Sequence, residues 1–175
     1  MPELNDLVLS IRAAGIPPVV LLDGGSGAGK STLARVLAPA LGAELVRLDD
    51  LYPGWDGLQA ASRAVADELL PRRRWRRWDW ASGRSAEWHE LDPSAPLLVE
   101  GAGALSRASR QLATFALWID LEPGERKRRA LERDGDVFAP HWDRWAAQED
   151  AFFSRERPDL LADLILDGET ISSFR

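Results

Sequence analysis

Short continuous apolar runs alternate along the chain with longer segments in which apolar residues recur at helical spacing. The continuous runs predict strands that are buried on both faces of a sheet. We predict five strands, at 19–22, 43–48, 97–99, 115–119 and 164–166. The periodic segments predict helices at 4–11, 33–41, 58–70, 123–133 and 140–153. Because strands and helices alternate, the sequence predicts an α/β fold in three layers, with helices on both faces of a mostly parallel five-stranded sheet.

Glycine and proline residues mark the expected helix ends. Gly15 and Gly42 follow the first two helices, Pro71 stops the third, and 134–136 breaks the fourth. The stretch 72–92 has no clear period and contains four of the eight tryptophans, so we expect it to be irregular.

Length and composition narrow the class of protein. The 175 residues favour one domain spanning 1–175, and a composition of 45% hydrophobic and 29% charged residues excludes a disordered chain. The net charge of −6 disfavours a nucleic-acid partner, and the absence of cysteine excludes disulfides and thiolate metal sites. No apolar run approaches a membrane span and the N-terminus lacks a basic signal region, so we expect a cytoplasmic protein without a membrane partner.

The sharpest motif is the glycine-rich segment 24–32, which matches the phosphate-binding pattern G-x-x-x-x-G-K-[ST] between a predicted strand and a predicted helix. Such a loop turns several N–H groups toward one anion, and the following helix adds its positive end. Lys30 would reach the β- and γ-phosphates and the Ser31 hydroxyl would coordinate Mg²⁺. We therefore expect ATP and Mg²⁺ as cofactors. The predicted cofactor-binding residues are Gly25, Ser26, Gly27, Ala28, Gly29, Lys30, Ser31 and Thr32.

Other sequence features select among phosphate-binding-loop proteins. The chain has no N-K-x-D segment for guanine, and residues 105–109 match the L-S-G-G-Q segment of transporter ATPases poorly. The small size favours a single-domain kinase of small molecules.

Six segments follow one another in an order typical of one kinase family. They are the loop at 24–32, Asp49-Asp50-Leu51-Tyr52, Trp78-Asp79-Trp80, Leu98-Val99-Glu100-Gly101, the arginines at 126, 129 and 133 after Asp120, and the segment 158–165. Together they resemble the uridine kinase-like branch of the P-loop kinases, within the P-loop NTPase superfamily. The resemblance implies an ATP-dependent phosphotransferase, with a lid helix at about 122–136 and an acceptor-binding region at about 52–91.

The resemblance also suggests residues that bind the acceptor. Tyr52, Trp78 and Asp79 match family segments in the acceptor-binding region. Nucleoside kinases of this family usually carry H-x-R after the Y-D-F segment. Here Ser82-Gly83-Arg84 lacks the histidine, so Arg84 is a shifted counterpart.

Three carboxylates lie at the carboxyl ends of predicted strands, where the ligands of parallel sheets bind: Asp23, Asp49 and Glu100. Asp49 is the best candidate base for an acceptor hydroxyl, the role that the resemblance also implies, although it could instead cap a turn. Asp50 is its rival as a ligand of Mg²⁺-bound water. Glu100 would hold a Mg²⁺-bound water or acceptor hydroxyls, or else form a structural pair with an arginine. The candidate metal ligands are thus Ser31, Asp49 and Glu100.

Arg126, Arg129 and Arg133 are spaced i, i+3 and i+7, so they share one helix face. A lid that closes over phosphates needs this geometry, and we predict a catalytic role for these arginines together with Lys30 and Asp49. A solvated charged helix face is the structural alternative.

The run Arg72-Arg73-Arg74-Trp75-Arg76-Arg77 permits three interpretations. Arginines interleaved with aromatics can bind single-stranded nucleic acid, but the acidic balance of the chain opposes this. The run could bind an anionic acceptor, or it could be a solvated turn paired with acids. Tyr52, Trp78, Asp79, Trp80 and Trp88 could line an acceptor pocket, although more than half of these are expected to be packing residues. Trp142 and Trp145 are expected to be core residues.

The sequence therefore predicts an ATP- and Mg²⁺-dependent kinase, monomeric or homodimeric, that phosphorylates a hydroxyl of a small, nucleoside-like or related metabolite. One alternative is a kinase with a phosphate acceptor, like the nucleoside monophosphate kinases, which needs no hydroxyl base. The other is an ATP-binding regulatory protein without a metabolite acceptor.

Overall fold

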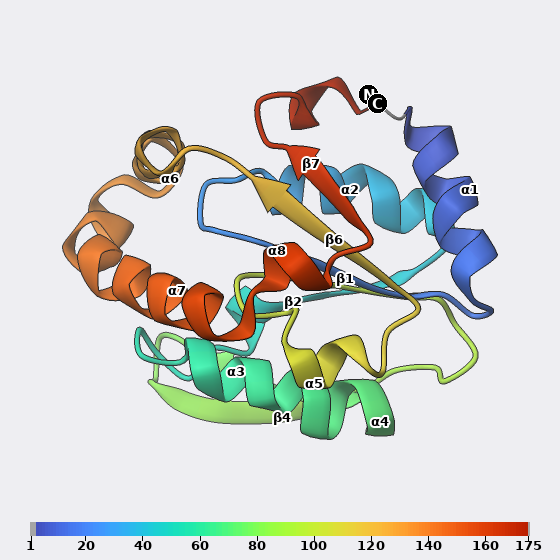
Figure 1. Cartoon of the computed structure of the whole chain (residues 1–175). Helices are drawn as coiled ribbons and strands as arrows, with labels where there is room; N and C mark the ends of the chain where they lie inside the picture. The colour runs from blue at the N-terminus through green and yellow to red at the C-terminus, as the bar shows by residue number, and fades with distance from the viewer. Residues whose placement is uncertain (1–2, 175) are drawn as a thin grey trace.

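The computed structural model describes residues 3–174, and its centre is a sheet of five parallel strands in the order β2-β5-β1-β6-β7 (Figure 1). Every neighbouring pair in this sheet is parallel. The strands are β1 Val19–Gly24, β2 Glu44–Arg47, β5 Leu97–Glu100, β6 Phe115–Asp120 and β7 Leu164–Asp167. This confirms the predicted α/β fold class, and the predicted strands agree with the observed ones to within two residues at each end.

Helices cover both faces of the sheet, as predicted. The longer ones are α1 Leu4–Ala14, α2 Lys30–Leu41, α6 Pro123–Phe138 and α7 Trp142–Glu156. A further helix is continuous in three segments, α3 Leu58–Ala64, the π-helical η2 Val65–Leu69, and α4 Leu70–Arg72. The short helical segments are η1 Leu48–Asp50, α5 Arg107–Arg110, η3 Ala139–His141, α8 Pro158–Leu161 and η4 Ile171–Ser173. None of the helices between residues 3 and 174 is long and apolar enough to cross a membrane.

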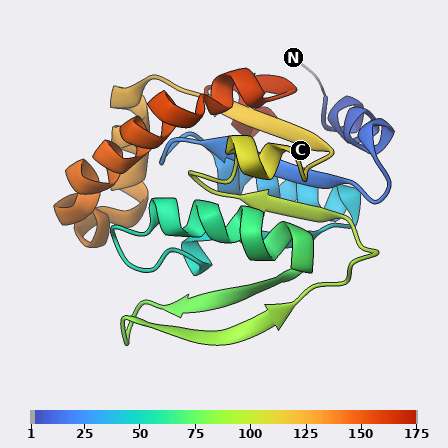
Figure 2. The ribbon, with the colours of Figure 1, turned by 60° about the horizontal axis from the view of Figure 1, so that its bottom comes forward.

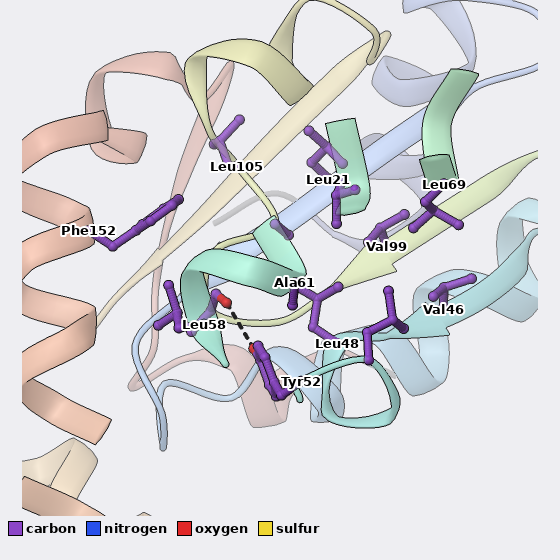
Figure 3. Close-up of a cluster of buried hydrophobic side chains, with 14 of the residues drawn as sticks. Leu21, Val46, Leu48, Tyr52, Leu58, Ala61, Leu69, Val99, Leu105 and Phe152 are labelled. Atoms are coloured by element: carbon purple, nitrogen blue, oxygen red, sulfur yellow. Dashed lines mark hydrogen bonds between the residues drawn. The ribbon is translucent and has the colours of Figure 1, made fainter. Parts of the chain in front are cut away.

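Alternation of side chains along β1 divides the core into two clusters, because successive residues of a strand point to opposite faces. Val20 and Leu22 pack with α1 and α2 on one face. Leu21 belongs to the cluster on the other face, which α3 and α7 cover. Figure 3 shows this second cluster, in which Leu21, Leu58 and Phe152 are fully buried.

A two-stranded antiparallel hairpin lies apart from the main sheet, beside α3 and α4 (Figure 2). It consists of β3 Arg74–Asp79 and β4 Arg84–Glu90. The prediction of an irregular stretch at 72–92 is therefore wrong for most of its length. Both strands are half-buried or exposed along their length, so the apolar alternation that reveals a one-sided strand is missing.

Most predicted helix ends are confirmed. Gly15 and Gly42 follow α1 and α2, and Gly135 interrupts α6 with φ 49° and ψ −129°. The stop at Pro71 is wrong, because the helix continues to Arg72 and ends at Arg73, which has a left-handed φ of 53°. The short helix α5, which a capping box of Ser106 and Ser109 begins, was not predicted.

Candidate active site

The phosphate-binding loop connects β1 to α2, as the motif predicts, and its glycines allow the sharp curl. Gly27 and Gly29 have φ of 84° and 107°, values that other residues rarely adopt. Lys30 begins α2 and is buried, and its Nζ donates to the carbonyl oxygens of Gly24 at 2.8 Å and Gly25 at 3.0 Å. The lysine charge is thus held inside the curl, where loop N–H groups and a cation would together meet a phosphate.

A cavity of about 450 Å³ opens beside this loop, and its lining residues are of two chemical kinds. The polar ones include Lys30, Ser31, Asp49, Glu100 and Arg133. The aromatic ones are Tyr52, Trp55, Trp80, Phe138 and Trp145. An apolar cavity with a few convergent polar groups is what a small-molecule site requires.

Asp49 and Glu100 reach this cavity from neighbouring strands. Asp49 follows β2 in η1, and Glu100 ends β5, which pairs with β2 in parallel, so both carboxylates lie at the same edge of the sheet. Burial raises the pKa of each carboxyl group above its ordinary value, and the Lys30 ammonium lowers it in part. Asp49 keeps access to solvent through the cavity, although the surrounding walls remove enough water to raise its pKa.

Glu100 also contacts the loop and a basic residue. Ser31 Oγ donates to Glu100 Oε1 at 2.9 Å, and Arg47 Nε lies 3.9 Å from the same oxygen. Glu100 thus has the arginine partner that the structural alternative requires, but the distance to Arg47 is long and Arg47 is half exposed. Hydroxyl and carboxylate oxygens are donors that Mg²⁺ prefers, so Ser31 and Glu100 could hold this ion directly or through water.

The predicted lid arginines have three different environments. Arg133 lines the cavity and pairs with Asp134. Arg126 lies across the loop and pairs with the buried Glu149 at 3.1 Å. Arg129 does not line the cavity. It bonds Glu125, the Gly168 carbonyl at 2.9 Å and Glu169, which ties α6 to the segment after β7.

Of the predicted acceptor residues, Tyr52, Trp80 and Glu100 line the cavity. Trp78, Asp79, Arg84 and Trp88 belong to the hairpin and lie outside it. Asp79 accepts bonds from Ala81 N at 3.1 Å and Ser82 Oγ at 2.6 Å, as a turn-forming aspartate does.

Two residues of the cavity wall, Trp55 and Phe138, lack a short-range sequence signal. The rings of Trp55 and Phe138 stack in the cavity wall with their centroids 5.5 Å apart, although the two residues are far apart in sequence. Trp80, in the hairpin turn, donates from Nε1 to the Asp49 carbonyl at 2.9 Å. Trp145 is buried as predicted for a core residue, but it also lines the cavity.

The arginine run of the hairpin is largely paired with acids. Arg72 and Arg74 both bond Glu68, and Arg77 bonds Glu87. None of residues 72–77 lines the cavity. This is the arrangement expected for the solvated, acid-paired interpretation of the run.

Asp23 is a third buried carboxylate at a strand end. It is fully buried at the end of β1 and accepts bonds from the backbone N–H groups of Gly24 at 2.6 Å, Gly103 at 3.1 Å and Leu105 at 2.8 Å. Burial raises the pKa of Asp23 to about 7, and these bonds and Lys30 lower it in part. Asp23 thus fixes the loop after β5 against β1.

A strand, a glycine-rich phosphate loop and a helix on a parallel sheet define the P-loop class of nucleotide-binding proteins. No family model matches the chain. A shikimate kinase from Corynebacterium efficiens is 34% identical over 125 residues, which cover 70% of this chain and 70% of the relative.

Solved structures share the fold at lower identity. A protein described as a possible uridine kinase from Bacillus stearothermophilus has a TM-score of 0.63 at 19% identity and covers 94% of this chain and 97% of its own. A gluconokinase from Sinorhizobium meliloti has a TM-score of 0.53 at 17% identity, with coverage of 90% and 89%. The chain belongs to the P-loop kinase family, and it is a phosphotransferase of the kind that acts on small molecules. P-loop kinases generally use ATP and Mg²⁺.

Proposed function

We propose that this kinase transfers the γ-phosphate of ATP to a hydroxyl of a small, neutral or cationic metabolite with a planar or apolar part, such as a nucleoside-like compound. One observation carries the proposal: the Asp49 carboxylate lies in the same cavity as Lys30 and Ser31 of the phosphate loop and the aromatic wall. A base, a phosphate cradle and an acceptor pocket that share one space are the parts that phosphoryl transfer to a hydroxyl needs.

In this proposal Asp49 accepts the proton of the acceptor hydroxyl as its oxygen approaches the γ-phosphorus. Burial raises the pKa of Asp49, which makes it a stronger base than an ordinary aspartate, and the Lys30 ammonium lowers that pKa in part. Lys30 and Arg133 offset the negative charge on the phosphates. Ser31 and Glu100 would hold Mg²⁺, which supplies charge neutralisation at the β- and γ-phosphate oxygens when bound.

Charge and shape within the cavity support a neutral or cationic acceptor. The aromatic lining includes Trp55, Trp80 and Phe138, and the arginine that lines the cavity, Arg133, is already paired with Asp134. A carboxylate-bearing or phosphorylated acceptor needs a free arginine fork to balance its charge. The aromatic rings instead favour a planar or apolar group.

The alternative with a phosphate acceptor has less support. The arginine run at 72–77 is the sequence feature that favours it. Arg72, Arg74 and Arg77 pair with glutamates away from the cavity, so they do not offer a site for an acceptor phosphate there. The alternative of a regulatory protein lacks an explanation for a metabolite-sized cavity beside Asp49.

The test is ADP release with ATP and Mg²⁺ against nucleosides, nucleoside monophosphates, vitamin precursors, sugars and shikimate, with Lys30→Ala as the blank. On the best acceptor, Asp49→Asn should lower turnover by about 100-fold or more, because general-base catalysis contributes that much. Binding of MgADP should be unchanged. The control is Asp67→Asn, an exposed aspartate that does not line the cavity and should keep turnover near the wild-type rate.

Two results would count against the proposal. Near-normal turnover by Asp49→Asn would show that Asp49 is not the general base. A nucleoside monophosphate as the best acceptor moves the function to phosphate transfer.

A further inference from the structure

A buried glutamate outside the loop motif joins the phosphate loop, α6 and α7. Glu149 of α7 is 1% exposed and accepts four hydrogen bonds. Its Oε1 accepts from Ser26 N at 2.8 Å, Ser26 Oγ at 2.7 Å and Trp145 Nε1 at 2.9 Å. Its Oε2 accepts from Arg126 Nη1 at 3.1 Å. One carboxylate therefore fixes a backbone and a side-chain donor of the loop together with an arginine of α6.

Attachment of α7 to the core does not require this carboxylate. Trp142, Trp145 and Phe152 on the same helix are buried in the apolar cluster. A buried ion pair is often no more stabilising than apolar residues of similar size, because two charges lose their water. The polar contacts of Glu149 are therefore better explained by the orientation that they give to Ser26 and Arg126 than by stabilisation of α7.

Glu149 does not line the cavity, whereas two of its partners, Ser26 and Trp145, do. It is thus placed behind the wall of the site, where it can act only through other residues. The Arg126 guanidinium has five N–H donors in a fixed fork, and the bond to Glu149 leaves others available.

Arg126 lies at the part of the loop where the γ-phosphate is expected. Lys30 Nζ, which in such loops reaches the β- and γ-phosphates, contacts the carbonyls of Gly24 and Gly25. The Arg126 guanidinium packs on the same segment so closely that a Cβ on Gly25 would lie 1.9 Å from Nη1. Arg126 Nη1 also lies 3.5 Å from the Ser26 carbonyl oxygen.

We infer that Glu149 is a positioning residue that holds Arg126 and Ser26 in place for the γ-phosphate of the nucleotide. The inference rests on the proposed function, since it assumes that the loop binds ATP. Glu149 does not line the cavity, and its negative charge keeps the guanidinium at the loop rather than in solvent.

The test compares two nucleotides that differ in the third phosphate and needs no acceptor. Calorimetry measures the Kd of MgADP and of the Mg²⁺ complex of AMP-PNP, a non-hydrolysable ATP analogue, for wild type and Glu149→Gln. Wild type should prefer AMP-PNP. The variant should lose about ten-fold or more of that preference, the usual effect of one hydrogen bond to a charged group, and keep its ADP affinity. The matched control, Asp150→Asn, changes an exposed carboxylate next on the helix and should keep the preference.

A double variant tests the route through the arginine. If Glu149 acts through Arg126, then Glu149→Gln should add little to the loss caused by Arg126→Gln. If Glu149→Gln does not fold, Glu149→Asp keeps the charge but withdraws it by one methylene, and it should lose part of the preference.

Four outcomes overturn the inference, and one of them also removes its basis. An unchanged preference in Glu149→Gln, or an equal loss of affinity for both nucleotides, leaves Glu149 a structural residue only. Additive effects in the double variant remove the route through Arg126. If wild type binds neither nucleotide, the proposed kinase function fails first and the inference fails with it.

Discussion

Asp23 should make the stability of this protein depend on pH. It is fully buried, and burial raises its pKa from 3.8 to about 7. Between these two values the folded carboxyl group holds a proton that the unfolded chain has released. The folded state therefore binds more protons than the unfolded state, and the free energy of unfolding falls as pH rises. The contribution is largest below the unfolded pKa and is lost by the time pH passes the folded pKa.

The size of the effect follows from the shift. One pKa unit corresponds to about 1.4 kcal/mol, so the shift from 3.8 to about 7 corresponds to roughly 4 kcal/mol over the whole window. About 2 kcal/mol of this falls between about pH 5 and pH 7, where measurements are practical. Asp23→Asn cannot titrate, so it should remove this part of the pH dependence. It also replaces an acceptor oxygen by a donor, which should cost about 1–3 kcal/mol at every pH.

The assay is urea unfolding of wild type and Asp23→Asn at several pH values across that window. Burial also raises the pKa of Asp49 and Glu100, so both add to the wild-type slope. The difference between the two proteins isolates Asp23. The matched control is Asp120→Asn, which changes an exposed aspartate at the end of the neighbouring strand β6 and keeps the Asp23 carboxyl group, so it should keep the Asp23 contribution to the slope. Equal slopes for wild type and Asp23→Asn would refute the reasoning.

Two further predictions concern the loop and the cavity wall. Gly27→Ala should weaken MgADP binding by at least about ten-fold in calorimetry, because φ is 84° and the new Cβ would lie 2.1 Å from the Arg126 carbonyl oxygen. Unchanged affinity would show that α6 moves aside at no cost. Tyr52→Phe should lower the urea-unfolding free energy by about 1–2 kcal/mol, because the buried hydroxyl bond to the Ala102 carbonyl, 2.8 Å long and drawn in Figure 3, is lost. Wild-type stability would mean that water replaces this bond.

The sequence predicts the main sheet well because each strand is buried on both faces. The runs at Val19–Gly24 and Leu97–Glu100 are almost wholly apolar, and such short runs between helices indicate parallel strands. The hairpin strand Arg84–Glu90 is largely exposed, and opposed pairs such as Arg77 with Glu87 connect it to its partner strand. Such pairing is a tertiary property that local periodicity does not contain.

The candidate site also contains some residues that the sequence predicts and others that it does not. Lys30 could be predicted from the phosphate-loop motif, and Asp49 and Glu100 because the carboxyl ends of parallel strands meet at one edge. Trp55 and Phe138 are far apart in sequence and come together only in the folded chain, so no spacing indicates them. The sequence indicates Glu149 more weakly. It shares the apolar face of its helix with Trp142 and Trp145, and a carboxylate buried on such a face needs hydrogen-bond partners.

Because the hairpin is separate from the main sheet, acceptor choice and nucleotide binding can change independently of each other. Within residues 3–174, β3 and β4 pair only with each other, and Trp80 in their turn lines the cavity that we propose binds the acceptor. Changes there can alter which metabolite fits without breaking a backbone bond of the sheet that carries the phosphate loop. Amide protons of β3 and β4 should exchange with solvent well before those of β1, which is paired on both sides. Relatives with new acceptors are therefore expected to differ most in this hairpin, while the nucleotide-binding strand and loop stay alike.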